Sequence, residues 1–334
     1  MRSLKKFIRI LSFCMIPALL LGCGGGAVAS ESPKKPISTE SVPTEDPFKN
    51  AFQKSDPAED DTLYILMTAA SFSYYYVEEL YGMFEAAGIK AKVCDMYKGS
   101  TGLDKAYEYW KAGENCYQLR IMDENGLTVT EGVNMEYCLR AYNWDLISFQ
   151  DGSASFRTTP AQQTLDRTRP YLTEMVEYVR KLLPKTRIFM QQIWAYDIGY
   201  DRNGFAMESA EQQLGMHDRI REYTLAACKE FNMERVPSGE AWKIARQSPV
   251  VGILCHRLAV NNGEGDYYHD GDIGGGQYLN ACVWFETLSG QSCIGNTYRP
   301  VYKQGALEHT LSEELVTVLQ QAAHQAVENM KAGK

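Results

Sequence analysis

The stretch Thr62–Gly88, TLYILMTAASFSYYYVEELYGMFEAAG, decides how the rest of the chain is organised. Leu63 to Met67 is a short apolar run of the kind that fills a buried strand, and the small residues after it allow a tight turn. A helix is expected next, because apolar residues recur at helical spacing from Val77 to Ala87. Ser73 is its expected N-cap and Gly88 its expected end.

Ser71 therefore stands between the carboxyl end of a strand and the amino end of a helix. In an open α/β sheet this is where ligands bind, and the free N–H groups there can hold a developing anion. The plainer alternative is that Ser71 is only a helix cap.

Strand, loop and helix alternate along the rest of the chain. Strands are expected at 91–96, 144–149, 187–194 and 235–238, a hairpin at 117–131, and helices at 104–112, 134–141, 164–183, 211–232, 240–246 and 277–288. This alternation predicts a three-layer α/β/α sandwich around a mainly parallel five-stranded sheet. No internal repeat is visible, which weighs against a two-lobed transporter subunit.

Charge excludes one class of partner. The 334-residue chain has a formal charge of −8 and is 45% hydrophobic, as in ordinary globular proteins. Without the first 22 residues, 30 basic residues face 42 acidic ones. No basic stripe remains to suit a nucleic-acid backbone, so no nucleic-acid partner is expected.

The amino terminus reads as an export signal. Basic residues precede an apolar segment, Ile10 to Leu21, that is too short to span a bilayer comfortably. It ends in Leu-Leu-Gly-Cys23, which resembles the lipobox of bacterial lipoproteins, so Cys23 is expected to carry a lipid that anchors the protein outside the cytoplasm. The alternative is an ordinary signal peptide cleaved after Ala29.

We expect a signal peptide at 1–22, a Pro-rich disordered tether at 23–61 and a folded domain at 62–330.

The cysteines do not predict a metal site. None of the eight that follow Cys14 forms a CxxC or Cys/His ligand spacing, so zinc is not expected. Several lie in apolar runs and resemble small buried hydrophobic residues, and no disulfide pairs are assigned.

A polar loop near the carboxyl end holds the most suggestive of the five histidines. Asp266 and His269 stand three apart in GDYYHDGD, just before the helix at 277–288. A catalytic base needs a carboxylate on one ring nitrogen and the nucleophile on the other. The alternatives are a surface loop, or a calcium loop in which Asp270 and Asp272 join Asp266, although the spacing does not match an EF-hand.

Short pieces spread along the chain carry a family resemblance. They are Ala70-Ser71-Phe72-Ser73, Tyr97-Lys98-Gly99-Ser100, Trp144 to Gln150, Trp194-Ala195-Tyr196, Val236-Pro237-Ser238-Gly239, Asp266 to His269 and Trp284-Phe285-Glu286. Together, over residues 62 to 291, they resemble a bacterial family of unknown function within the SGNH/GDSL hydrolase superfamily. That resemblance implies an SGNH/flavodoxin-like sandwich and no cofactor.

The resemblance also implies roles for single residues. Ser71 would be the nucleophile, His269 its general base and Asp266 the group that orients the imidazole. The backbone N–H groups of Ser71 and of Gly99 or Ser100 would form two arms of an oxyanion hole, and the third would be the amide of Gln150, where the superfamily has asparagine.

Two departures stand out. The nucleophile block reads Ala-Ala-Ser rather than Gly-Asp-Ser, and Ser100 follows Gly99 where relatives have paired glycines.

The expected function is a lipid-anchored serine esterase that removes acetyl or other short acyl groups from carbohydrate through a covalent acyl-enzyme. The alternative is a non-catalytic surface lipoprotein that binds glycan or peptide in the same cleft. The oligomeric state is not predicted.

Overall fold

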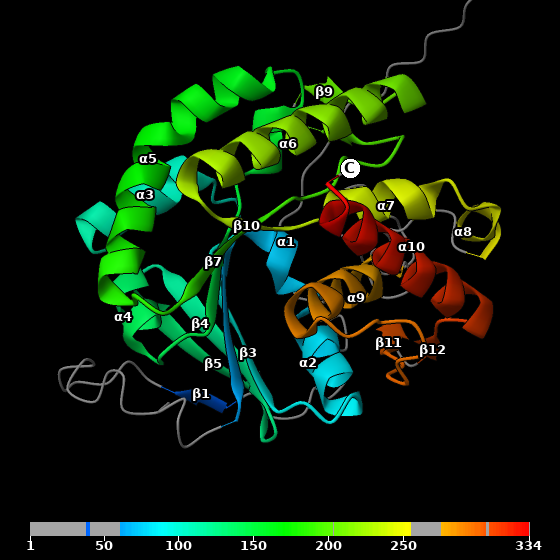
Figure 1. Ribbon diagram of the computed structural model, residues 1–334, viewed down its shortest axis with the longest axis horizontal. Coiled ribbons are helices and arrows are strands. Elements are labelled where there is room, and N and C mark those ends of the chain that lie inside the picture. Colours follow the sequence, from blue (N-terminus) through cyan, green and yellow to red (C-terminus); the bar gives the residue numbers. More distant parts are fainter. Residues whose placement is uncertain (1–37, 41–60, 203, 255–274, 305–306, 334) are drawn as a thin grey trace, which may run out of the picture.

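A mixed sheet of eight strands forms the centre of the computed structural model, which describes residues 38–40, 61–202, 204–254, 275–304 and 307–333 (Figure 1). Five of its strands are parallel and lie in the order β3-β2-β6-β7-β10. They are β2 (Leu63–Ala69), β3 (Ala91–Tyr97), β6 (Leu146–Phe149), β7 (Arg187–Gln191) and β10 (Glu234–Val236). Counted along the chain this is the doubly wound order 2-1-3-4-5. The predicted parallel strands and flanking helices are confirmed, but the sheet has eight strands and not the five that were predicted.

Three further strands extend the sheet beyond β3. The predicted hairpin is β4 (Tyr117–Asp123) and β5 (Gly126–Val133), and β4 pairs with β3 in antiparallel register. This extension of the sheet was not predicted. β1 (Ser38–Glu40) pairs in parallel with β5, although these residues fall in the segment expected to be a tether. The remaining residues of that segment, apart from Asp61, lie outside the described residues.

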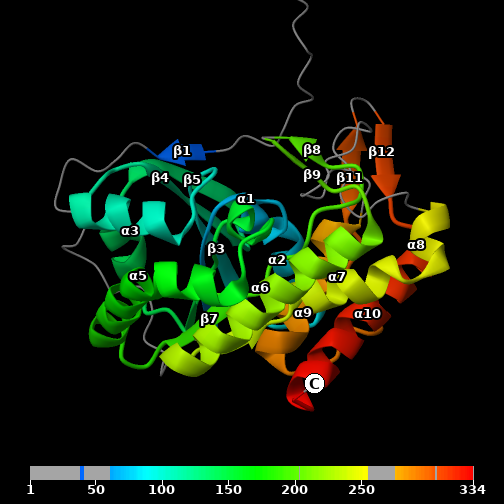
Figure 2. The ribbon, with the colours of Figure 1, turned by 90° about the horizontal axis from the view of Figure 1, so that it is seen from above.

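Helices cover both faces of the sheet (Figures 1 and 2). α3, α5 and α6 lie on one face, and α2, α7, α9 and α10 on the other. The helices are α1 (Ser71–Tyr74), α2 (Val77–Ala86), α3 (Leu103–Ala112), α4 (Met135–Arg140), α5 (Ala161–Leu182), α6 (Ala210–Phe231), α7 (Ser238–Arg246), α8 (Pro249–Leu254), α9 (Gly276–Ser289) and α10 (Glu313–Lys331), with a 3₁₀ turn at Ser153–Phe156. Two small hairpins, β8–β9 (Asp201–Arg202 and Phe205–Ala206) and β11–β12 (Val301–Gln304 and Leu307–Thr310), stand apart from the sheet.

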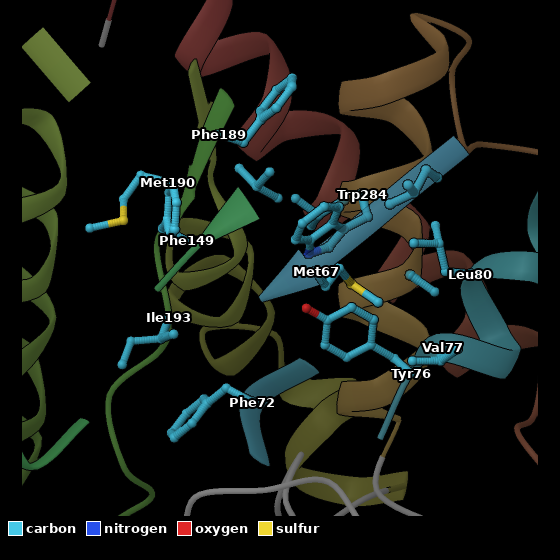
Figure 3. Close-up of a cluster of buried hydrophobic side chains, with 14 of the residues drawn as sticks. Met67, Phe72, Tyr76, Val77, Leu80, Phe149, Phe189, Met190, Ile193 and Trp284 are labelled. Carbon is cyan, nitrogen blue, oxygen red and sulfur yellow. The ribbon is translucent and has the colours of Figure 1, made fainter. Parts of the chain in front are cut away.

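The core lies on both sides of β2, whose residues Ile65, Leu66 and Met67 are fully buried. A strand buried on both faces reads as a continuous apolar run, as this one does. Figure 3 shows Met67 close to Trp284 of α9 and to Tyr76, just before α2. α9 is buried from Gly276 to Glu286, because α2, α7 and α10 pack around it.

No helix in the described part of the chain is long and apolar enough to cross a membrane.

Candidate active site

Two neighbouring parallel strands send the chain to opposite faces of the sheet, which creates the crevice where ligands bind in doubly wound folds. β2 leads into α1 and α2 on one face, whereas β6 leads through the 3₁₀ turn to α5 on the other. The two strands pair directly, with Met67 opposite Ser148. Ser71 follows β2 and Gln150 follows β6, so both stand at the carboxyl edge beside this crevice.

Ser71 is the first residue of α1 and is partly exposed, as its place between strand and helix predicted. Ala70 occupies the N-cap position and supplies no side-chain cap. The first N–H groups of a helix have no acceptor within it, so they are available to an oxyanion. Ser71 is therefore not a capping serine.

Ser73 does not have its predicted role. The expected helix is divided into α1 and α2, with Tyr76 at the N-cap of α2, so the prediction that Ser73 caps it is wrong. Ser73 is fully buried, and its Oγ donates a 2.7 Å hydrogen bond to Oδ1 of Asp95 on β3. The reason is that a buried carboxylate needs donors, and a serine at the third position of α1 can reach it.

Arg120 on β4 holds α1 in place through contacts with Tyr74, the last residue of that helix. Its Nη1 donates to the Tyr74 carbonyl at 2.7 Å, and its guanidinium lies 3.9 Å from the centre of the Tyr74 ring. The same nitrogen is 3.8 Å from Oδ2 of Asp95. Burial raises the pKa of Asp95 to about 7, although Arg120 and Ser73 act in the opposite direction. The Ser73–Asp95–Arg120 network thus fixes the short helix that begins with Ser71.

The turn after β3 brings backbone N–H groups to the same edge. Gly99 and Ser100 are exposed, and Ser100 adopts a left-handed φ of 59°. This conformation favours glycine, which agrees with the paired glycines of the family pattern. Asp151 Oδ1 accepts from the N–H groups of Leu103 and Gly152 at 3.1 and 2.8 Å, and so ties this turn to the one after β6.

Gln150 is almost completely buried, with 4% of its surface exposed. Neither its Nε2 nor its Oε1 has a hydrogen-bond partner within the described ranges. Its side chain lines a cavity of about 20 Å³, enough for about one water molecule, together with Thr68, Thr101 and Tyr117. Ser71 and Gly99 do not line this cavity. The end of the strand is where it was predicted, and the Gln150 side chain borders this cavity.

Asp266 and His269, the predicted orienting acid and base, lie outside the described residues, as do Asp270 and Asp272 of the calcium alternative and the lipid-anchor residue Cys23. Two other histidines have described side chains. His217 is buried 3.4 Å from Glu240, and His324 contacts Glu286. Segment 255–274, which carries Asp266 and His269, leads into α9, and α9 packs against α2.

The structure explains why two of the family-like pieces matter. Trp194 lies in the loop after β7. Its ring centroid is 4.7 Å from that of Phe72 of α1 and 4.4 Å from that of Trp242 of α7, on which it stacks. Gly239, at the start of α7, lies so close to this loop that a Cβ would come within 2.4 Å of the Ile193 carbonyl oxygen. Only glycine fits there without a shift of the backbone, so these pieces hold the loop beside α1.

The cysteines of the described ranges form no disulfide that could brace this site. The six cysteines in the described ranges are free. Burial raises the pKa of Cys94 and Cys138, which makes their thiolates scarce.

The fold and the position of Ser71 define a doubly wound α/β protein with a partly exposed serine at its topological switch point. The chain belongs to the family described as "Domain of unknown function (DUF4886)", whose model matches residues 64–326. The family resemblance seen in the sequence is thereby confirmed.

A solved structure of a DUF4886 family protein from Bacteroides uniformis is similar with 26% identity and a TM-score of 0.67, over 80% of this chain and 95% of that one. More distant likenesses include phospholipase A1 from Streptomyces albidoflavus, with 10% identity, a TM-score of 0.37 and coverage of 68% and 98%. A GDSL-like lipase from Bacteroides thetaiotaomicron shows 9% identity, a TM-score of 0.36 and coverage of 71% and 89%. No curated protein matches the chain.

Proposed function

We propose that this protein is a serine ester hydrolase that removes acetyl or other short acyl groups from carbohydrate. The observation that carries the proposal is the position of Ser71 at the switch point, at the first turn of a helix that buried polar contacts hold in place. A serine there is partly exposed and stands at a helix N-terminus, where backbone N–H groups can stabilise an oxyanion.

In the proposed mechanism Ser71 Oγ attacks the ester carbonyl and forms an acyl-enzyme. His269 takes the hydroxyl proton and returns it to the departing alcohol, while Asp266 orients the imidazole. Water then cleaves the acyl-enzyme, again with His269 as base, and restores Ser71. The N–H groups of Ser71 and of Gly99 or Ser100 stabilise the oxyanion, and each such donor is typically worth about 10² to 10³ in rate.

Gln150 is the weakest member of this proposed set. Its amide has unused hydrogen-bonding capacity, but its side chain borders the small cavity, which Ser71 and Gly99 do not line. We therefore assign most of the oxyanion stabilisation to backbone groups and expect a Gln150→Ala variant to retain activity within about tenfold, less than one well-placed donor would cost.

Substrate class and location complete the proposal. Tyr74 and Tyr97 are partly exposed at the edge that carries Gly99, with ring centroids 4.4 Å apart, and such amphipathic surfaces suit sugar rings. A lipid on Cys23 would hold the domain on the outer side of the cell membrane, where carbohydrate esters are available.

The direct test is labelling with a serine-directed fluorophosphonate probe together with hydrolysis of p-nitrophenyl acetate. We expect labelling at Ser71 and loss of both signals in Ser71→Ala, because the nucleophile would be absent. Ser248→Ala, just beyond α7, is the matched control and should behave as the natural protein does. A well-folded protein that neither reacts with the probe nor hydrolyses the ester would be a glycan- or peptide-binding lipoprotein instead.

A further inference from the structure

A second cluster of functional side chains lies away from Ser71, between the last two helices. Glu286 comes from α9, and His324 and Glu328 come from α10. Each offers one ligand atom, and the three atoms lie within 4.8 Å of one another. His324 and Glu328 are four residues apart, so they share one face of α10.

Glu286 is the anchor of this cluster, because only 1% of its side chain is exposed. Its Oε2 accepts a 2.9 Å hydrogen bond from the Cys293 N–H, which fixes the carboxylate. Its Oε1 lies 2.7 Å from Nδ1 of His324. Within the described ranges His324 is its ion-pair partner, and no lysine or arginine side chain is paired with it. Neither of these contacts is with a permanently charged side chain, and a buried carboxylate is stabilised by a nearby cation.

We propose that Glu286, His324 and Glu328 bind one divalent transition-metal ion, preferably Zn²⁺. One imidazole nitrogen and two carboxylate oxygens form a ligand set that suits zinc, whereas Mg²⁺ and Ca²⁺ prefer oxygen alone. Metal–ligand distances of about 2.0 to 2.2 Å place tetrahedral ligands about 3.3 to 3.6 Å apart, so the donors need to move by only about 1 Å.

The exposed members of the cluster can make that movement. The His324 and Glu328 side chains are 37% and 47% exposed. The competing pair between Glu328 and Lys331 is a surface contact between side chains that are both nearly half exposed, so it contributes little. Ser292 Oγ, 3.4 Å from His324 Nδ1, adds a further oxygen at the rim, and water can complete the coordination. The ion would join α10 to α9.

The test is isothermal titration of the untagged full-length protein, freed of metal with EDTA, with ZnCl₂ and separately with MgCl₂ and CaCl₂. We expect one equivalent of Zn²⁺ at micromolar affinity or tighter, with at least tenfold weaker binding of the other two ions. Saturating zinc should raise Tm by about 5 °C, because it binds only the folded state.

Two variants and a control make the result decisive. His324→Ala should abolish zinc binding, and Glu328→Gln, at an exposed position, should weaken it at least tenfold without affecting folding. Gln325→Ala, exposed on the same helix, should bind zinc as the natural protein does. Absence of zinc binding, or equal affinity in the Glu328→Gln variant, would overturn the proposal and leave a hydrogen-bonded Glu286–His324 pair. Neither readout depends on esterase activity.

Discussion

Two carboxylates, the fully buried Asp95 beside α1 and the partly buried Glu240 at the start of α7, respond to their surroundings in opposite ways. The pKa of Asp95 is raised to about 7, whereas that of Glu240 is lowered to about 2. Burial raises the pKa in both, so the difference lies in the donors. Asp95 receives one hydroxyl hydrogen bond and a guanidinium at 3.8 Å, and its Oδ2 has no hydrogen-bond partner within the described ranges.

Glu240 has many more partners. His217 lies 3.4 Å from one of its oxygens, and Gln192 and Arg221 lie 3.2 and 3.0 Å from the other. Arg235 approaches the same oxygen at 3.8 Å and donates to Gln192 Oε1. Glu240 thus stabilises the structure at the start of α7, next to the edge strand β10. A carboxyl group that is poorly compensated, such as Asp95, is more typical of a functional site, and Asp95 contacts Ser73 of the short helix that begins with the proposed nucleophile.

The largest expected effect concerns Asp95. Because its folded pKa is raised from 3.8 to about 7, its contribution to stability is fully present below about pH 4 and is lost as the pH rises through 7. The implied upper limit is roughly 4 kcal/mol. The natural protein should therefore lose stability between pH 4 and pH 8. The Asp95→Asn variant should not show this loss, because its amide does not titrate. Urea unfolding at several pH values measures this, and identical pH profiles for the two proteins would contradict the assigned pKa.

Glu240 should behave in the opposite sense. Its lowered pKa contributes stability that is present above its ordinary value near 4.5 and is lost as the pH falls toward 2. Glu240→Gln leaves Arg235 and Arg221 without their carboxylate and should destabilise the fold by about 3 kcal/mol at pH 7. The control is Glu230→Gln, which breaks only an exposed pair with Arg169 and should cost less than about 1 kcal/mol. Equal urea midpoints for both variants would remove the distinction between the two carboxylates.

A smaller effect is expected for Ser73→Ala. The change removes the one hydroxyl that donates to Asp95 and should cost about 1 to 3 kcal/mol, because it leaves a buried acceptor with fewer partners. The loss should shrink below pH 6, where Asp95 becomes protonated. Chemical denaturation at pH 5 and pH 8 compares the two conditions, and a cost independent of pH would show that Ser73 acts through packing alone.

These details show where sequence reasoning succeeds. The apolar run before Ser71 predicted a buried strand, and the strand-to-helix position of Ser71 followed from it, because both depend on local patterns. The parallel strands and the long helices were also found, although their ends shifted by a few residues. The predicted strand at 187–194, for example, ends at Gln191.

The missed features depend on distant partners. Ser73 matched a capping pattern, but Asp95, 22 residues away, uses its hydroxyl. Nothing local marks Arg120 as the support of α1, since the contact requires β4 to pair with β3. The available signal was Asp95 itself, which is followed and preceded by apolar residues in the strand Ala91–Tyr97, because a strand core rarely carries an uncompensated charge. The grouping of Glu286 with His324 likewise depends on how α9 meets α10.

The burial of α9 has a consequence for how the chain acquires its structure. This helix supplies Trp284 and Phe285 to one face of the sheet and is itself covered by α10, the last helix of the described chain. During synthesis, a chain that has emerged only through α7 leaves the apolar wall of β2 and α2 exposed to water. Completion of the core therefore waits for the carboxyl-terminal part, and apolar surface that is exposed until then is prone to aggregation.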